Sequence, residues 1–379
     1  MIIDATRGKP NAMQVALANE LINMPLTSYV TEGIDVRNYG VGDGLPAMKR
    51  IFAELLGVDA YEVIVGGNSS LNLMFDCFAT FVLAEQWGSG AKFICPVPGY
   101  DRHFSISEYF GVEMINVAMT ENGPDMDIVE KLAADPDVVG MWCVPVFSNP
   151  QGYVYSDETI ARLAKMKTAH PHFKIFWDDA YTIHHFSGSR PTPLNILSEC
   201  RKNGNESRPV MFASFSKISV AGAGVSCFAA SGDSLATLRK RMNAQTIGHD
   251  KVNQQKHINF FKDVKGVEAH MQKHAAILRP KFEYAIAYME KHLKDTGATF
   301  TRPQGGYFIS VETLPGCAKR VCQICKENGV LITDAGATFP YGKDPADSNL
   351  RFAPTFLSID ELEKTLEVFC AAIKTASET

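Results

Sequence analysis

Short apolar runs alternate with helix-length amphipathic segments over the first two thirds of the chain. Such apolar runs are nearly continuous, and segments such as "PAMKRIFAELLG" and "DETIARLAKMKTAH" separate them. Strands that are apolar on both faces are typical of a parallel sheet that helices cover on both sides. The pattern therefore predicts an α/β fold with a mostly parallel sheet of the seven-stranded type. The expected strands are "EVIVGG", "KFICP", "GVEMINV", "VVGMWCVP", "FKIFWDD", "PVMFAS" and "VSCFAAS".

The pattern changes after about residue 232. Long helical stretches come first, and short strands and helices are then mixed, as in "GGYFISVE" and the final "SIDELEKTLEVF". Mixed short elements are typical of an α+β arrangement. We therefore expect a large domain over residues 31–264 and a smaller α+β domain formed by residues 1–30 and 265–379.

Composition limits the classes of function. The 379 residues are 46% hydrophobic and carry a net charge of −5, so a large core is available and no basic excess favours nucleic acid. The start "MIIDATRGKP" has no basic region followed by an apolar run, and no unbroken apolar stretch approaches membrane-spanning length. We expect a cytoplasmic protein with no membrane or nucleic-acid partner.

The nine cysteines are an odd number scattered through a long chain, which favours reduced thiols over a disulfide framework. Cys322 and Cys325 would share one side of a helix, yet no second Cys/His pair is near them in the sequence. An amphipathic helix face is favoured over a zinc site, and we expect no metal.

Polar and aromatic residues follow the ends of the expected strands. In α/β sheets, ligands bind beyond the carboxyl ends of the strands. Each residue alone also suits a helix cap or a turn, but their joint order favours a ligand site. The residues are Ser69, Ser70, Tyr100, Asn149, Asp178, Tyr181, Ser214, Ser216 and Lys217.

The chemistry of this set indicates one cofactor. Ser69 and Ser70 at a helix start offer N–H groups and hydroxyls to a phosphate. Tyr100 offers a flat face to a ring, and Asp178 a carboxylate that favours a protonated ring nitrogen. Lys217, among small residues, offers an amine that forms a Schiff base with an aldehyde. Together with hydrogen bonds from an asparagine and a tyrosine to a phenolate oxygen, these needs describe pyridoxal 5′-phosphate.

The motifs "TRGKP", "YGVGDGLPAMK", "SFSKISVAGAGV", "TIGHDKVNQ" and "LRFAPTF" are spread over essentially the whole chain. With them the chain resembles the fold type I pyridoxal-phosphate aminotransferases of the class I/II superfamily. It is most similar to the bacterial aspartate aminotransferase branch called class Ic. The resemblance implies a homodimer with shared active sites. It also implies amino transfer from aspartate to 2-oxoglutarate through aldimine and ketimine intermediates on Lys217.

The resemblance also implies roles for single residues. Lys217 would be the Schiff-base lysine and the proton carrier between substrate and cofactor. Asp178, rather than the neighbouring Asp179, would pair with the pyridine nitrogen, while Tyr181 and Asn149 would hydrogen-bond the ring oxygen.

The remaining positions match the periphery of the family's site. Tyr100 would stack on the ring, Tyr39 would reach the phosphate from the other subunit, and Arg351 would clamp the substrate α-carboxylate as a two-pronged pair. The phosphate would be held by Ser69, Ser70, Ser214 and Ser216.

One position departs from the family's pattern. Most relatives carry a phosphate-binding arginine eight residues after the lysine, where this chain has Val225. Lys251 and Lys256 are candidates for the missing cation, and each could equally be solvated. For a second substrate carboxylate the candidates are Arg7 and Lys9, which could also be surface charges.

Three other readings remain open or are disfavoured. A different pyridoxal-phosphate reaction, such as β-elimination, or another amino donor would use the same lysine and aspartate. A nicotinamide dehydrogenase is disfavoured because neither "GAG" at 222–224 nor "GVGDG" at 40–44 has the glycine pattern and context of a dinucleotide loop. A non-catalytic cofactor-sensing regulator is disfavoured by the charge.

Overall fold

A central sheet of eight strands organises the computed structural model, which describes residues 2–84, 87, 90–186 and 188–378. The strand order is β4–β11–β10–β9–β8–β5–β6–β7, and the ladder is parallel from β10 to β6. All seven expected strands are present, and the eighth is the two-residue edge strand β7. The bounds are β4 Val63–Val65, β5 Lys92–Val97, β6 Glu113–Thr120, β7 Gly123–Pro124, β8 Val138–Cys143, β9 Lys174–Asp178, β10 Pro209–Ser214 and β11 Ser226–Ala230.

The strands are apolar on both faces because each face supports a separate core. In β9, Phe176 packs into the core on one side of the sheet, and Ile175 and Trp177 pack into the core on the other. This alternation is the period-2 geometry of a strand. It explains why the expected strands read as continuous apolar runs rather than as alternating ones.

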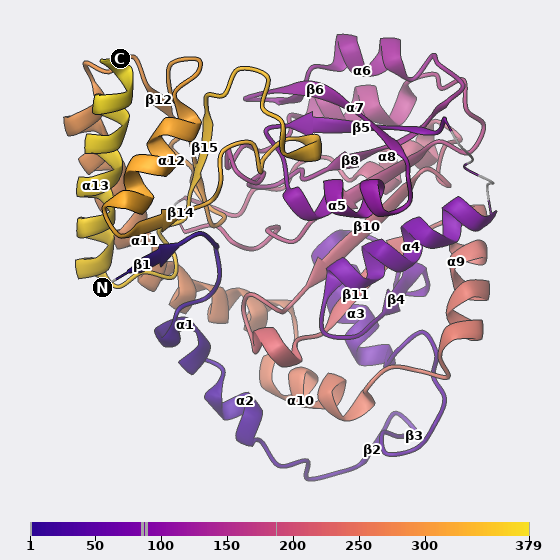
Figure 1. The fold of residues 1–379 in the computed structure, drawn as a ribbon. Helices are drawn as coiled ribbons and strands as arrows, with labels where there is room; N and C mark the ends of the chain where they lie inside the picture. Colours follow the sequence, from indigo (N-terminus) through magenta and orange to yellow (C-terminus); the bar gives the residue numbers. More distant parts are fainter. Residues whose placement is uncertain (1, 85–86, 88–89, 187, 379) are drawn as a thin grey trace.

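Helices cover both faces of this sheet (Figure 1). α4, α5 and α9 contribute to the core on one face, and α3, α6, α7 and α8 to the core on the other. The two short helices α5 and α8 were not among the expected elements. The bounds are α3 Pro46–Leu56, α4 Ser70–Ala84, α5 Asp101–Tyr109, α6 Met126–Leu132, α7 Asp157–Lys165, α8 Ile196–Lys202, α9 Gly232–Gln245 and α10 Lys251–Phe261.

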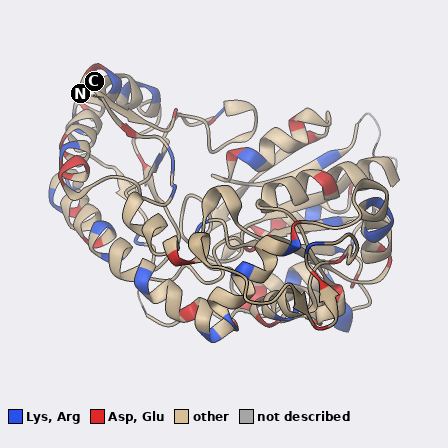
Figure 2. Ribbon diagram, turned by 90° about the horizontal axis from the view of Figure 1, so that it is seen from below, with Lys and Arg blue, Asp and Glu red and all other residues tan. Residues whose placement is uncertain are grey.

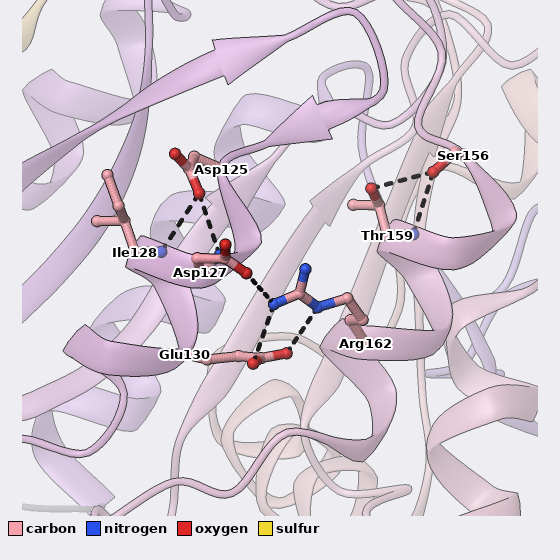
Figure 3. A network of polar contacts seen from close by, with 7 residues as sticks. All are labelled: Asp125, Asp127, Ile128, Glu130, Ser156, Thr159 and Arg162. Carbon is pink, nitrogen blue, oxygen red and sulfur yellow. Dashed lines mark hydrogen bonds and ion pairs between the residues drawn. The ribbon is translucent and has the colours of Figure 1, made fainter.

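Polar contacts fix α6 against α7 on their exposed sides (Figure 3). Arg162 of α7 donates from Nε to Glu130 at 2.9 Å and from Nη2 to Asp127 at 2.6 Å, and both acids lie on α6. Asp125 and Ser156 cap the two helices by accepting backbone N–H groups of their first turns. Such caps satisfy donors that a helix start leaves unpaired.

The C-terminal part forms a second, smaller layer of helices and short strands. β12, β13 and β15 make an antiparallel sheet, and the N-terminal strand β1 pairs in parallel with β14, Ile3 opposite Val330. Both chain ends therefore lie on this side (Figure 1). The bounds are β1 Ile3–Ala5, α11 Val264–Leu293, β12 Thr299–Phe300, β13 Ile309–Glu312, α12 Ala318–Glu327, β14 Val330–Ile332, β15 Asn349–Phe352 and α13 Ile359–Ser377.

Short elements complete the chain between these parts. They are α1 Ala12–Ala16, α2 Asn19–Asn23, β2 Val30–Thr31, β3 Ile34–Asp35 and the 3₁₀ turns η1 Ala60–Glu62, η2 Ala221–Ala223 and η3 Pro340–Gly342.

Helix α11 belongs to both hydrophobic cores. Val267 and Met271 pack with the large core, whereas Ala275 and Leu278 pack with the core of the smaller layer. The division into residues 31–264 against 1–30 with 265–379 stays a prediction. The two cores support a crossover inside α11, after Met271.

Charges of both signs are interspersed along the helices seen in Figure 2. Among the described residues, no helix is both long and apolar enough to cross a bilayer. All nine cysteines are free thiols, and Cys325 is fully buried on α12 while the Cys322 thiol donates to the carbonyl of Thr333.

Candidate active site

Most of the expected site residues meet beyond the carboxyl edge of the sheet. A cavity of about 610 Å³ lies there between the sheet, the N-terminal segment and β15. We call it the lysine cavity. Its lining includes Tyr100, Asn149, Tyr181, Lys217, Arg351, Arg7 and Lys9. The strand order explains the convergence, since Asn149 and Lys217 follow β8 and β10, and Asp178 ends β9 between these two strands.

Asp178 ends β9 with a buried carboxylate that is only half satisfied. Its side chain accepts a hydrogen bond on Oδ2 from Nε2 of His103, 3.0 Å away, when that nitrogen carries the proton. The ring of His103 stacks on Trp142 with centroids 4.3 Å apart. The other oxygen, Oδ1, is buried without a partner among the described groups. A buried unpaired carboxylate oxygen is costly, and a protonated ring nitrogen would satisfy it.

His103 was not among the site residues predicted from sequence. It lies on α5 one turn after Tyr100, so its ring meets the tyrosine edge to face at 5.0 Å while its Nε2 reaches Asp178. The sequence "GYDRH" places this histidine three residues after the expected stacking tyrosine, but its partner Asp178 lies 75 positions further along the chain.

Asp179 faces the opposite side of the sheet. It lines a different cavity, of about 240 Å³, together with Trp177 and Arg190. Burial, with a smaller contribution from Asp178, raises the pKa of Asp179 to about 7 against the opposing effect of Arg190. The geometry therefore separates the two neighbouring acids, and only Asp178 shares the side of His103 and Tyr100.

Lys217 follows β10 in a loop whose backbone is fixed by a chain of hydrogen bonds. Its Nζ lies 4.9 Å from the centroid of the Tyr181 ring. Its backbone carbonyl accepts a hydrogen bond from the hydroxyl of Tyr307 at 3.3 Å, and that hydroxyl accepts one from Gln14 at 3.1 Å. Gln14 lies on α1 and is fully buried, and its amide also contacts His274 at 3.1 Å. The N-terminal segment, whose Arg7 and Lys9 were expected at the substrate, is thus also tied to the lysine loop by Gln14 and Tyr307, which were not predicted.

The two tyrosines beside Lys217 are phenols rather than phenolates at neutral pH. Burial raises the pKa of Tyr100 to about 12, although the nearby Lys217 ammonium opposes the shift. Burial and the charge of Asp178 raise the pKa of Tyr181 further. Both hydroxyls can therefore donate hydrogen bonds to an anionic oxygen.

The serines lie along the start of α4 and the end of β10. Ser70 begins α4, Ser69 precedes it, Ser214 ends β10 and the hydroxyl of Ser216 donates to the carbonyl of Asn68. All four residues are half-buried, and none of them is among the residues that line the lysine cavity.

Gly224 approaches this serine segment closely. A Cβ at Gly224 would lie 2.9 Å from both Cα and Oγ of Ser216, a contact that real side chains do not make. The absence of a side chain therefore allows the "AGAGV" loop to pack against the residue before Lys217.

Val225, which stands where most relatives carry an arginine, is a core residue in the structure. Val225 is buried in the large core, and its carbonyl accepts the N–H of Phe215. The amines of Lys251 and Lys256 each donate at 3.0 Å to a backbone carbonyl, of Gly40 and Ile22 respectively. Neither bond reaches the serines, so the replacement for the arginine stays open.

Arg351 lies on β15 with its guanidinium inside the molecule. Its Nη1 donates to Oδ1 of Asp101 at 2.8 Å and to Oδ1 of Asn149 at 3.4 Å. The guanidinium carbon lies 5.0 Å from the centroid of the Phe308 ring. Nε is buried without a partner among the described groups, so one N–H of this cation remains unpaired.

The candidates for a second carboxylate are exposed at the rim of the lysine cavity. Arg7 and Lys9 line it, and the Lys9 amine lies 4.1 Å from the centroid of the Phe356 ring. Arg102, which the sequence analysis did not name, lines the same cavity. Tyr39 is elsewhere, on the loop before α3, and is 84% exposed.

Comparison with known proteins identifies the family. The sequence model of the aspartate amino-transferase family matches residues 1–379. The chain belongs to the aspartate aminotransferase family. An aspartate aminotransferase of Corynebacterium glutamicum is 44% identical over 376 residues, which are 96% of this chain and 87% of that protein.

Solved structures agree with this membership of the family. The crystal structure of an aspartate transaminase from Corynebacterium glutamicum superposes with a TM-score of 0.97 at 42% identity, covering all of this chain and 92% of that one. An α-aminoadipate aminotransferase from Thermus thermophilus, complexed with N-(5′-phosphopyridoxyl)-L-leucine, has the same fold. Its TM-score is 0.80 at 20% identity, over 99% of this chain and 92% of that one.

Two predictions from sequence are thereby confirmed. The fold is that of the fold type I aminotransferases, and the protein is an aminotransferase. Membership of the family implies pyridoxal phosphate as the cofactor. The half-satisfied Asp178 carboxylate, the Lys217 amine and the serine segment fit that group.

Proposed function

We propose that this enzyme transfers the amino group of aspartate to 2-oxoglutarate, using pyridoxal 5′-phosphate bound through Lys217. The observation that carries the proposal is the shared position of three groups. The Lys217 amine and the Arg351 guanidinium line one cavity, and the buried carboxylate of Asp178 with its unpaired oxygen ends the neighbouring strand. The name of the 44% identical relative supports aspartate as the donor.

In this proposal the cofactor, when bound, supplies an electron-withdrawing ring that stabilises negative charge on the substrate carbon. Asp178 would hold the ring nitrogen through its unpaired Oδ1, while His103 contacts the other oxygen. Tyr181 and Asn149 would donate hydrogen bonds to the ring oxygen. Tyr100 would stack on one face of the ring.

Lys217 would serve as acid and base once the substrate amine has replaced its own amine on the cofactor. Its Nζ would take the proton from the substrate Cα and deliver it to the C4′ carbon of the cofactor. Its carbonyl is anchored by Tyr307, so the loop stays in place while the amine moves. Ser69, Ser70, Ser214 and Ser216 would hold the phosphate, the first two at the start of α4.

Substrate selection is assigned to cations at two ends of the lysine cavity. Arg351 would bind the α-carboxylate as a two-pronged pair. Arg7, Lys9 and Arg102 at the rim are the candidates for the second carboxylate of aspartate. A dicarboxylate substrate requires both.

The homodimer and the cytoplasmic location are further parts of the proposal. The exposed ring of Tyr39 supports a contact with another copy of the chain, where it would reach the phosphate. Nine free thiols suit a reducing compartment.

The test is a spectroscopic titration of the purified protein loaded with pyridoxal phosphate. Aspartate should abolish the visible absorption band of the bound aldehyde form, and 2-oxoglutarate should restore it. Replacing Lys217 with Ala should lower turnover by at least about 10²–10⁴-fold, the usual contribution of an acid–base group. Aspartate leaving the band unchanged would reject the donor. Release of pyruvate, ammonia and a thiol from an added cysteine S-conjugate would instead indicate β-elimination.

A further inference from the structure

A carboxylate from the protein itself contacts Arg351. Oδ1 of Asp101 lies 2.8 Å from Nη1 of Arg351, and both residues line the lysine cavity with Lys217. Asp101 is the first residue of α5, directly after Tyr100. The group that contacts the proposed substrate-binding cation therefore has the chemistry of the substrate's own α-carboxylate.

This contact uses only part of the guanidinium. Asp101 and Asn149 both accept from Nη1, whereas Nε is buried and unpaired. A free carboxylate can form two parallel hydrogen bonds with a guanidinium, which is stronger than one. A substrate carboxylate that takes Nη1 as one of its two donors can therefore outcompete Asp101, but it must first break the existing Asp101–Arg351 ion pair.

The two partners differ in freedom to move. The Arg351 side chain is 7% exposed and packs on Phe308, whereas the Asp101 side chain is 36% exposed. Asp101 also lies in the first turn of α5, where the helix dipole stabilises a negative charge without Arg351. Asp101 is the member of the pair that can turn away when a ligand arrives.

We propose that Asp101 is an internal competitor that occupies Arg351 and lowers the affinity of the site for every α-carboxylate. The proposal rests on the assignment of Arg351 as the carboxylate-binding residue. Displacing Asp101 costs the same free energy for any ligand that pairs with Arg351. The cost is equal in the bound substrate and in the transition state, so Asp101 raises KM and leaves kcat unchanged.

The test compares Asp101→Asn with Asp334→Asn in the cofactor-loaded enzyme. Asp334 is a second carboxylate that lines the lysine cavity, so its replacement removes the same charge without touching the Asp101–Arg351 contact. The probes are propionate, a monocarboxylate, and succinate, a dicarboxylate, with dissociation constants measured by calorimetry. Neither probe has an amino group, so the measurement needs no turnover.

We expect Asp101→Asn to bind both probes about tenfold more tightly, the scale of one hydrogen bond to a charged group. The KM for the amino donor should fall by a similar factor with kcat retained. Asp334→Asn should change binding by no more than about twofold, as for an exposed charge.

Several results would overturn the proposal. Weaker binding in Asp101→Asn would show that Asp101 orients Arg351 for the substrate instead. Unchanged binding, an equal gain in Asp334→Asn, or a gain for succinate alone would show that Asp101 does not compete for Arg351.

Folding and function are checked separately. Circular dichroism and the cofactor absorption verify that each variant is folded and loaded. If Asp101→Asn is not, Asp101→Ser replaces it, and Asp334→Ser replaces the control in the same way. If aspartate is not a donor but both probes bind more tightly to Asp101→Asn, the proposed function fails while the competitor role stands.

Discussion

At the level of single residues, the face of the sheet decides what each of two buried acids can do. Asp178 and Asp179 are adjacent, and period-2 geometry sends them to opposite faces. Asp178 meets His103 and keeps one oxygen unpaired, whereas the carboxyl of Asp179 has its pKa raised to about 7 mainly by burial. The resemblance to relatives favoured Asp178. His103 was missed because its partner is distant in sequence, and nothing in the sequence shows that the two side chains meet.

Replacing Asp179 with Asn should alter the pH dependence of stability. With a folded pKa above the unfolded one, the native state binds more protons, so stability present below about pH 4 is lost as pH rises toward 7. Asn remains neutral and escapes this loss. The free energy of unfolding of the variant, relative to that of the parent protein, should therefore rise by about 2–3 kcal/mol between about pH 5 and pH 8.

Denaturant unfolding at about pH 5 and about pH 8 measures this gain in stability. Cofactor titration provides the matched control, since Asp178→Asn should impair cofactor binding and Asp179→Asn should not. Parallel stability curves for Asp179→Asn and the parent protein would refute the raised pKa.

At the level of elements, the sequence predicted what hydrophobic pattern alone determines. The seven strands were recovered because each is buried on both faces and reads as an apolar run. α5 was missed because its buried side includes His103 and Ser107, polar residues that pair with Asp178 and Trp142. Its helical period is visible only once those partners are known.

The tight contact of Gly224 with Ser216 gives a prediction for the loop after Lys217. Gly224→Ala should displace the serine segment and weaken pyridoxal-phosphate binding by about tenfold or more, because overpacking costs typically 1–3 kcal/mol. Gly222→Ala is the control, since a Cβ there meets no atom within 4 Å. Titrating the cofactor-free variants with pyridoxal phosphate measures both. Equal affinities of the two variants would show that the close approach does not shape the cofactor site.

At the level of the whole molecule, the site depends on parts that are far apart in sequence. The N-terminal segment reaches Lys217 through Gln14 and Tyr307, and β15 brings Arg351 to the cavity. Such contacts could be placed only by resemblance to a family, because composition and periodicity carry no information on which distant segments meet. The cation that replaces the arginine at Val225 could not be found by either route.

The proposed sharing of sites between two copies can be tested with hybrid dimers. Lys217→Ala and Tyr39→Ala subunits, each impaired alone, should recover activity when refolded together, because a mixed dimer contains one site with both native residues. Random pairing of a two-fold dimer gives about a quarter of the parent activity. Recovery no greater than the sum of the separate variants would place Tyr39 outside the partner's site.

The most direct test of the central claim is to find where the aldehyde of the cofactor attaches. The loaded enzyme is reduced with borohydride, digested, and its peptides are measured by mass spectrometry. We expect the phosphopyridoxyl mass on the peptide that contains Lys217, and its loss when aspartate is added before reduction. The same mass on another lysine, or on none, would contradict the account.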